Sequence, residues 1–313
     1  MTTPNQTIMQ KADMQVADLI ADGGYLQAEQ SKKFIQDLVK QAVLLQLATV
    51  YGMKSHTRLI DKVGISGRVL RPGTSGHALA AADRVKPTTD QVTLTTSLFR
   101  GELRLPDEVL EDNIEDGNFK NTVMSMMAEH ISLDIDDIVA NGDTASADPY
   151  LAKFDGARKL AVSHTVNAGG AAISKTFLKN ALKAMPSQWN RNRAAQRFLT
   201  SEDAEVDYRD YLADRATVLG DKFMQDEAPV RYGGRAILPV PVFPDNLYGS
   251  GKATDILLTD PKNMVVGFWR QVKVETDRDI TSGEWIMVAS LRFGFQYQEE
   301  DAVVKVYDIL TQP

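Results

Sequence analysis

The sequence predicts an α+β protein organised around one long helix, and three patterns support this fold class. Residues 118–141 carry apolar side chains at helical spacing, residues 58–70 and 91–98 alternate apolar and polar side chains as strands do, and residues 167–274 alternate helix-like with strand-like segments. Strand patterns without helices follow residue 275, and within them Leu291, Phe293, Phe295 and Tyr297 alternate with other residues to form one apolar face. The tail must therefore pack on an element formed earlier. We expect that element to be the long helix.

The long helix is predicted from the spacing of its apolar residues. They recur every three or four positions and form one stripe: Phe119, Val123, Met126, Met127, His130/Ile131, Ile135 and Ile138. Asp116 or Asn118 can cap the first turn, and Asn141-Gly142 supplies a left-handed stop. At 1.5 Å per residue, the rod is about 35 Å long.

The same region is strongly acidic. Between Pro106 and Asp143, Lys120 is the only basic residue, and the acidic ones are Asp107, Glu108, Glu111, Asp112, Glu115, Asp116, Glu129, Asp134, Asp136, Asp137 and Asp143. A helix with this much negative charge favours a basic surface beside it. The sequence provides such a surface directly upstream.

Residues 54–98 predict a long basic β-hairpin with arms of about 40 Å. Its tip, residues 71–90, is rich in glycine, proline and alanine and is expected to be loose. A two-stranded hairpin has no core of its own, so we expect it to lie on the acidic helix of a neighbouring copy. The basic residues of this region outnumber Asp61, Asp83, Asp90 and Glu102; they are Lys54, Arg58, Lys62, Arg68, Arg71, Arg84, Lys86, Arg100 and Arg104.

Composition bounds the class of protein. The chain has 313 residues, of which 43% are hydrophobic and 25% are charged, as in a globular protein of one large or two closely joined domains. It has no cysteine, which excludes disulfides and thiolate chemistry, and its net charge of −7 argues against broad binding of nucleic acid. No apolar run is long enough to span a membrane, and the N-terminus lacks the pattern of a secretion signal.

None of the candidate chemical motifs is complete. Residues 249–253 resemble a phosphate loop but lack its first glycine and the serine or threonine after the lysine. His130 and Asp134 have an i, i+4 spacing, but no other histidine stands at ligand spacing, so we interpret His130 as a packed helix residue. Asp134, Asp136 and Asp137 lack the features of a calcium loop and are predicted to form a surface face. The sequence predicts no catalytic residue, no metal and no cofactor.

The order of these parts resembles the major capsid protein of tailed phages, the Hong Kong 97-type fold. Besides that order, the resemblance is carried by Asn141-Gly142-Asp143, Phe154-Asp155-Gly156, Gly220-Asp221, residues 232–241 and residues 272–295. It covers the chain from about Ser31 onward. It implies an N-terminal arm (1–30), an extended hairpin loop (54–98), a peripheral domain (31–53, 99–166 and 275–313) with a spine helix at about 118–141, and an α/β axial domain (167–274).

The resemblance also implies a function. Such a protein self-assembles into hexamers and pentamers that form the icosahedral shell of the virion around double-stranded phage DNA, and it is assembled in the host cytoplasm. It implies a separate scaffolding protein, a portal protein and a decoration protein as partners. The candidate contacts between subunits are charged residues of the hairpin and of the acidic region: Arg58, Lys62, Arg68, Arg71, Arg84, Glu111, Asp112, Glu115, Asp134 and Asp137.

Two alternatives stay open at the level of sequence. An encapsulin-type shell of a cellular nanocompartment has the same fold, and an enclosed enzyme that co-purifies with the shell would favour it. An α/β enzyme of unknown chemistry is the second alternative, and a compact monomer in solution would favour it. The absence of a complete catalytic motif argues against the enzyme.

Overall fold

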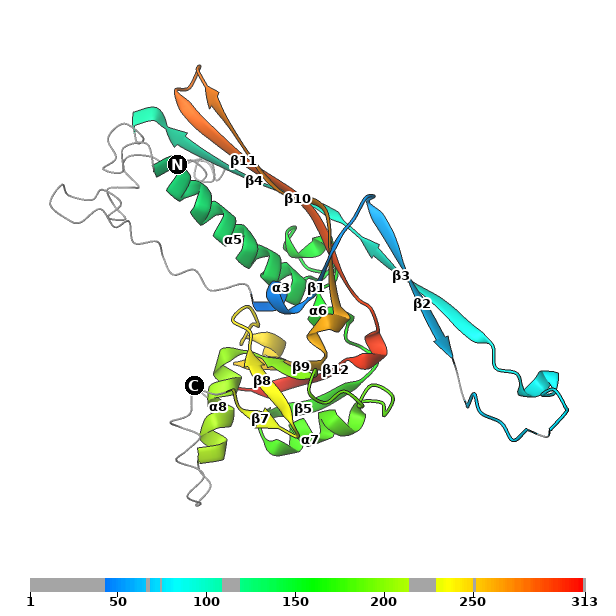
Figure 1. Cartoon of the computed structure of the whole chain (residues 1–313). Helices are drawn as coiled ribbons and strands as arrows, with labels where there is room; N and C mark the ends of the chain where they lie inside the picture. Colours follow the sequence, from blue (N-terminus) through cyan, green and yellow to red (C-terminus); the bar gives the residue numbers. More distant parts are fainter. Residues whose placement is uncertain are drawn as a thin grey trace.

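A computed structural model describes residues 43–65, 68–73, 75–108, 119–213, 229–249 and 252–311. They form an upper unit around a four-stranded sheet, a lower unit around a six-stranded sheet, and a hairpin that leaves the body between them (Figure 1). The helices are α3 (Val43–Leu47), α5 (Phe119–Asn141), α6 (Ala157–Leu160), α7 (Lys175–Ala184) and α8 (Glu202–Ala213), with short 3-10 turns at Ala81–Asp83, Leu151–Lys153, Leu247–Gly249, Pro261–Asn263 and Glu300–Ala302.

The strands are β1 (Thr49–Gly52), β2 (Thr57–Ile65), β3 (Pro87–Thr95), β4 (Ser97–Pro106), β5 (Thr165–Ala172), β6 (Arg197–Thr200), β7 (Arg231–Tyr232), β8 (Arg235–Pro239), β9 (Ala253–Thr259), β10 (Met264–Asp279), β11 (Glu284–Tyr297) and β12 (Val304–Leu310). No described helix is both long enough and apolar enough to cross a bilayer.

The upper unit packs α5 against one face of the sheet β1-β10-β11-β4. Strand β11 is antiparallel to both β10 and β4, whereas β1 runs parallel to β10. Ile135 and Ile138 of α5 are buried in one cluster with Leu291 and Phe293 of β11. The prediction that the tail packs on the long helix is therefore confirmed, because these residues belong to the two predicted apolar faces.

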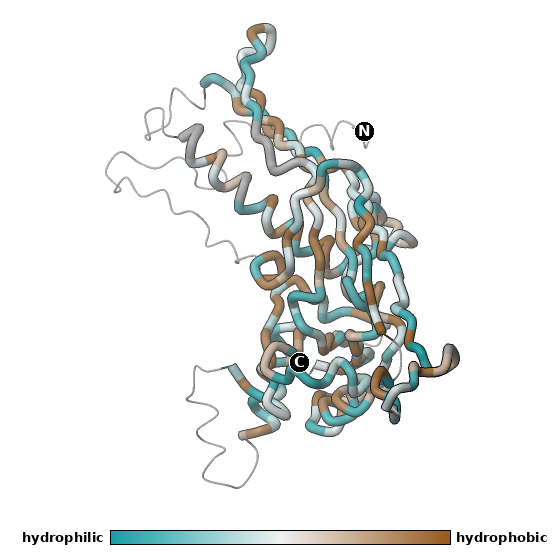
Figure 2. Tube along the Cα trace, turned by 45° about the vertical axis from the view of Figure 1, so that its right-hand side comes forward, coloured by the Kyte–Doolittle hydropathy of each residue, from teal (hydrophilic) through white to brown (hydrophobic). Residues whose placement is uncertain are grey.

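The lower unit is a mixed sheet in the order β5-β12-β9-β6-β8-β7, covered by α7 and α8. Its core includes Leu178 of α7, Tyr208 of α8, and Phe198 and Ile256 of the central strands, all at most 1% exposed. The brown segments of Figure 2 run along the central strands of both units, whereas polar segments dominate their outer edges. One face of the lower sheet therefore has a core of its own, whereas Leu199 and Leu257 of the same sheet belong to the buried cluster of Ile135 and Phe293 in the upper unit.

The hairpin is a separate two-stranded sheet, paired from Thr57 with Thr95 to Ile65 with Pro87. It projects away from both units, and its tip lies far from α5 (Figure 1). At its base, the fully buried Leu94 packs with Met53 and Val265 of the body. Only the base of the hairpin therefore shares a core with its own subunit.

Several predicted boundaries differ from the structure. The predicted arms 58–70 and 91–98 are observed at Thr57–Ile65 and Pro87–Thr95, since a proline is tolerated as the first residue of a strand. The chain then turns at Thr96 and continues as β4, the edge of the four-stranded sheet.

Sheet membership also differs from the predicted domain ranges. Strand β10 runs unbroken from Met264, so residues 264–274 join the upper sheet rather than the α/β block. Strand β12 lies between β5 and β9, so residues 304–310 join the lower sheet rather than returning to the long helix. Hydrophobic patterns mark strands but not their partners, which is why sequence placed both segments in the wrong unit. Of residues 31–53, which the resemblance assigns to the peripheral domain, the described part forms α3 and β1.

Candidate assembly interface

The hairpin exposes an apolar face. Leu59, Val63 and Ile65 alternate along β2 and therefore point to one side of the strand, where they are 53%, 73% and 61% exposed. Val69 and Leu70, which follow the strand, are 56% and 83% exposed. Asp61 also lies on this side of β2, but the number of exposed large apolar residues on one arm is typical of a surface that another protein covers.

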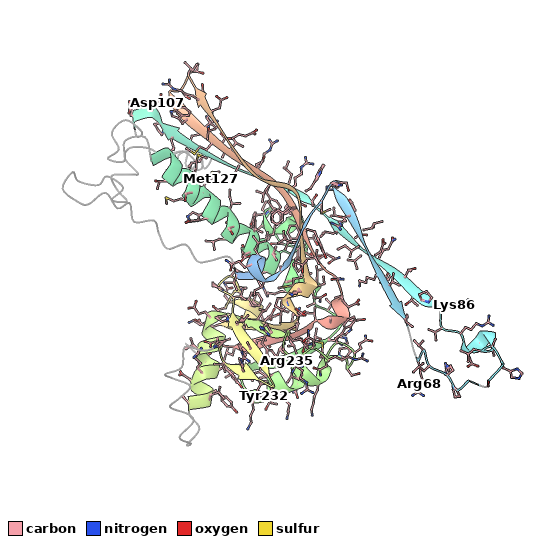
Figure 3. The ribbon with its side chains drawn as sticks, viewed as in Figure 1. Arg68, Lys86, Asp107, Met127, Tyr232 and Arg235 are labelled. Atoms are coloured by element: carbon pink, nitrogen blue, oxygen red, sulfur yellow. The ribbon has the colours of Figure 1, made fainter. Side chains whose placement is uncertain are left out.

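The hairpin also carries cations at the start of its tip. Arg68 and Lys86 come from the two sides of the hairpin and are exposed (Figure 3), and neither forms an ion pair with any described residue. Two other predicted contact residues have weak partners within the tip. Arg71 Nε lies 4.0 Å from Asp83 Oδ1, and Arg84 Nε donates to the Leu79 carbonyl at 3.2 Å. These four positive charges therefore face solvent in the single subunit.

Two further predicted contact residues are engaged within their own subunit. Lys62 Nζ lies 3.2 Å from Glu299 Oε2, in a site where both side chains are largely covered. The Arg58 guanidinium lies 4.9 Å from the centroid of the Tyr51 ring. These contacts hold the base of the hairpin to the body, so Lys62 and Arg58 contribute to its direction as well as to its charge.

The acidic residues of α5 do not form one surface face. Asp134 is exposed, and partial burial raises the pKa of its carboxyl. Asp137 is partly covered and accepts a hydrogen bond from Asn141 Nδ2 at 2.7 Å. Asp136 is only 2% exposed, and its carboxylate accepts the backbone N–H groups of Leu44 and Leu45 at 3.0 and 2.8 Å.

The surface prediction is therefore wrong for Asp136, which satisfies the first N–H groups of α3 across 92 positions in the sequence. Burial raises the pKa of its carboxyl to about 6, against the opposing effect of the backbone donors. His130 is exposed, so the prediction that it is a packed residue is also wrong. Glu111, Asp112 and Glu115 lie outside the described residues.

Among the described residues of one subunit, the basic hairpin does not meet α5. The hairpin leaves the body on the side opposite to the free end of α5 (Figure 1), so the described cations of its tip lie far from Asp134 and Asp137. Pairing between the hairpin of one copy and the helix of another stays a prediction. Such pairing requires a hairpin that extends beyond its own subunit, and the tip of this hairpin does so (Figure 1).

A polar cluster that the sequence did not reveal joins the two units. Asp255 of β9 is 1% exposed and accepts both Arg158 Nε and Nη2, at 3.1 and 3.0 Å, as well as the hydroxyl of Tyr248 at 2.8 Å. Arg158 Nη1 donates to Asn141 Oδ1 at 2.8 Å, at the end of α5. The cluster therefore links the long helix to the lower sheet by charge-assisted bonds, with both Arg158 donors converging on Oδ2 of Asp255 and Tyr248 donating to Oδ1. Only the fold brings these residues together.

An aromatic cluster packs in the same core as the buried residues of α5. The Phe99 ring stacks on Phe293 with centroids 4.7 Å apart, and Phe154 meets Phe293 edge-on at 5.6 Å. The alternating pattern of residues 291–297 identified the buried face of β11, but the contribution of Phe99 and Phe154 depends on tertiary contacts.

Nothing in the described residues has the form of a catalytic centre. No three histidine, aspartate or glutamate side chains within these residues lie close enough together to hold a metal ion. A groove of about 540 Å³ lies between β2 and the loop before β6, and polar residues such as Lys62, Gln196 and Glu299 line it. These residues do not form a nucleophile–base arrangement of the kind that acyl or phosphoryl transfer needs.

The described residues form two sheet units linked at one long helix, and a hairpin that projects beyond both units, an arrangement suited to a subunit that packs against copies of itself. Residues 23–308 match the family model described as the phage capsid family. The chain belongs to the phage capsid family, and many copies of such a chain form the shell of the virion.

A relative in Bacillus subtilis (strain 168), YqbE, carries the description of a prophage capsid protein; it is 35% identical over 309 residues, which cover 97% of this chain and 99% of the relative. The structure is similar to the capsid of the native GTA particle, with a TM-score of 0.65, 16% identity, and coverage of 93% of this chain and 98% of that one. It is also similar to the SrpI encapsulin of Synechococcus elongatus PCC 7942, with a TM-score of 0.66, 12% identity, and coverage of 96% and 98%. These likenesses confirm the Hong Kong 97-type fold.

Proposed function

We propose that the hairpin is the main device by which this capsid protein joins its neighbours. The observation that carries the proposal is the exposed apolar row of β2, with Val63 73% exposed, on an arm whose described residues share a core with their own subunit only around Leu94 and Ile60. Covering Leu59, Val63 and Ile65 removes apolar area from water, at roughly 25 cal/mol per Å². The binding free energy comes from that area, summed over several contacts per subunit.

The charges of the two surfaces set the orientation of the contact. Arg68, Arg71, Arg84 and Lys86 of one copy lie over an acidic surface of another, which includes Asp134 and Asp137 and extends to Glu111, Asp112 and Glu115. Exposed ion pairs contribute only about 0–1 kcal/mol each, so their effect is on the rate and register of assembly more than on affinity.

The assembled form that fits these contacts is a set of hexamers and pentamers closed into an icosahedral shell around double-stranded DNA. The net charge of −7 supports a container that holds DNA without sequence-specific binding. A separate scaffolding protein, a portal protein and a decoration protein complete the assembly, which takes place in the host cytoplasm. The role is structural and not enzymatic.

The test is a charge reversal at the hairpin tip. Arg68→Glu with Lys86→Glu changes two exposed cations that have no ion-pair partner among the described residues, so we expect the subunit to fold normally and to fail to close shells. Lys62 is left intact, because its ion pair with Glu299 belongs to the fold. Closed shells are counted by electron microscopy after expression with and without scaffold.

The matched control reverses two exposed cations of α7, Lys175→Glu with Lys179→Glu, which gives the same change in net charge. We expect this control to assemble normally. Normal shells from the hairpin variant would overturn the proposed role of the tip charges.

The encapsulin alternative rests on the fold likeness to SrpI alone, at 12% identity. The two roles differ in contents. Shells that contain a co-purifying enzyme in place of DNA would favour the nanocompartment.

A further inference from the structure

A second charged site lies at the root of the hairpin, away from the apolar row of β2. A pocket of about 480 Å³ opens where the hairpin, the four-stranded sheet and the turn Leu151–Lys153 meet. Its lining consists of His56, Thr96, Ser97, Leu98, Lys153 and Arg292. Three of these six residues can carry positive charge, and none is acidic.

The fold holds Arg292 in place at this pocket. Its guanidinium lies 4.4 Å from the centroid of the Trp269 ring, a cation–π geometry that orients the planar group. The ring of His56 lies 6.1 Å from the same Trp269 ring. Arg292 pairs with Leu98 across the sheet, which brings the start of β4 to the same wall. The guanidinium is therefore presented by a rigid strand and not by a loop.

The other walls add hydroxyl groups and a second cation. The Ser97 hydroxyl donates to the Lys153 carbonyl at 3.2 Å and so ties the turn to β4. The buried Thr96 bonds the carbonyl of His56 through both its N–H and its hydroxyl, at 3.0 Å each, which fixes the backbone of His56. Neither Arg292 nor Lys153 forms an ion pair with any described residue. The positive charges of this pocket thus lack an anion within the described subunit.

We infer that this pocket receives a carboxylate side chain from a second copy of the chain. Converging cations repel one another and gain most from one anion placed between them, and an arginine held by stacking suits bidentate binding of a carboxylate. The chain has 42 acidic residues against 35 lysines and arginines, so a neighbouring copy is rich in suitable groups. The proposal rests on the proposed function, since it needs a neighbouring copy within the shell.

A DNA phosphate is the other anion to consider, and the geometry favours it less. Proteins that hold nucleic acid without sequence preference spread their cations along a stripe that follows the backbone. Here the three cationic residues line one open pocket, and the chain as a whole carries a charge of −7. The group found in this pocket in shells assembled without DNA therefore distinguishes a neighbour's carboxylate from a DNA phosphate.

The first experiment is an assembly assay of the full chain with Arg292→Gln and Lys153→Gln together. We expect the assembled fraction to fall by about tenfold or more, because the neighbour's carboxylate would lose both of its cationic partners at the interface. Arg292→Lys keeps the charge but loses the planar group that stacks on Trp269, so its assembled fraction is expected to lie between those of the unaltered chain and the double variant. Lys175→Gln with Lys179→Gln is the matched control and should assemble as the unaltered chain does, and urea unfolding of each monomer checks that all variants fold.

Normal assembly of the double Gln variant, alongside a folded monomer, would overturn the inference but leave the proposed function intact. Failure of the unaltered chain to assemble under any condition would instead count against the proposed function. The second experiment is cryo-electron microscopy of shells assembled without DNA. A neighbour's carboxylate within about 4 Å of the Arg292 guanidinium supports the inference. A pocket that is empty without DNA and filled with it would contradict the inference and favour phosphate.

Discussion

Strands β11 and β2 follow the same alternating pattern but end in opposite environments. In β11, Met287, Leu291 and Phe293 are 0%, 4% and 1% exposed, because α5 covers that face of the sheet. In β2, Leu59, Val63 and Ile65 are 53%, 73% and 61% exposed, because nothing in the described subunit covers them. Alternation therefore identifies a face that needs a partner, and the fold decides whether the partner is internal.

The comparison separates two kinds of side chain by their expected effects. A buried residue of β11 contributes to the free energy of unfolding of the monomer, and its loss leaves a cavity. An exposed residue of β2 contributes little to the monomer and matters only after a neighbour has covered it. Substitutions matched between the two strands should therefore change different measurements.

The largest effect is expected at Phe293, which contacts the rings of Phe99, Phe154 and Phe268. Phe293→Ala should lower the free energy of unfolding by about 3–5 kcal/mol, as for other buried aromatic truncations. Urea unfolding of the monomer, followed by circular dichroism, measures this loss. A loss below about 1 kcal/mol would mean that the aromatic cluster is not a tight core.

The next largest effect on stability is expected at Gly294, where the backbone of β11 lies close to the backbone at the base of the hairpin. A Cβ on Gly294 of β11 would lie 1.9 Å from the carbonyl oxygen of Thr95, the last residue of β3. Gly294→Ala should therefore cost about 2 kcal/mol or more and displace the base of the hairpin. Gly73→Ala is the control, since a Cβ there meets nothing within 4 Å, and its effect should stay within about 0.5 kcal/mol.

Asp136 gives a smaller effect that depends on pH. The pKa of its carboxyl is about 6 in the folded protein, above the value of 3.8 expected for an unfolded chain. The folded form therefore binds the proton more tightly, and the contribution of this group to the free energy of unfolding rises as the pH falls from 7 towards 4. At 1.36 kcal/mol per pKa unit, the change is about 3 kcal/mol at most.

Asp136→Asn removes the titration and keeps one oxygen that can accept from Leu44 or Leu45, in place of the two carboxylate oxygens that each accept one of these N–H groups. Urea unfolding at a series of pH values should show that the difference in stability between the unaltered chain and the variant changes between pH 7 and pH 4. A difference that is constant over this range would show that the carboxyl does not titrate there.

Substitutions on the exposed face of β2 are expected to have the smallest effect on the stability of the monomer and a large effect on assembly. In the double variant Leu59→Ala with Val63→Ala, each substitution should change the free energy of unfolding by less than about 0.5 kcal/mol, since both side chains are exposed in the monomer. The same variant should assemble poorly, because the area lost is covered only in the shell. A stability loss as large as that of Phe293→Ala would show that the face is covered within the monomer.

The sequence predicted those features of the fold that depend on residues close together in the chain, and it missed those that depend on distant ones. The helix Phe119–Asn141 and the buried face of β11 were predicted because a repeat of three to four or of two residues is a local signal. The roles of Asp136, Arg158 and Asp255 could not be predicted, because each depends on a partner about 90 or more positions away. For the same reason, the sequence placed β12 in the wrong unit.

The interface residues divide in a similar way. The positive charge of the hairpin was visible in the sequence, but the engagement of Lys62 by Glu299 and of Arg58 by Tyr51 required the fold. The pocket of Arg292 gave no sequence signal, since its lining comes from four separate segments.

The most direct measurement uses the absence of cysteine from the chain. Val63→Cys places a single thiol on the exposed face of β2, where a photoactivatable cross-linker can be attached without competing sites. After irradiation of assembled shells, we expect covalent dimers and longer chains whose linked peptides come from two copies, and only monomers at dilutions that prevent assembly. Cross-links in assembled shells that join Val63→Cys only to its own chain would contradict the claim that the hairpin rests on a neighbour.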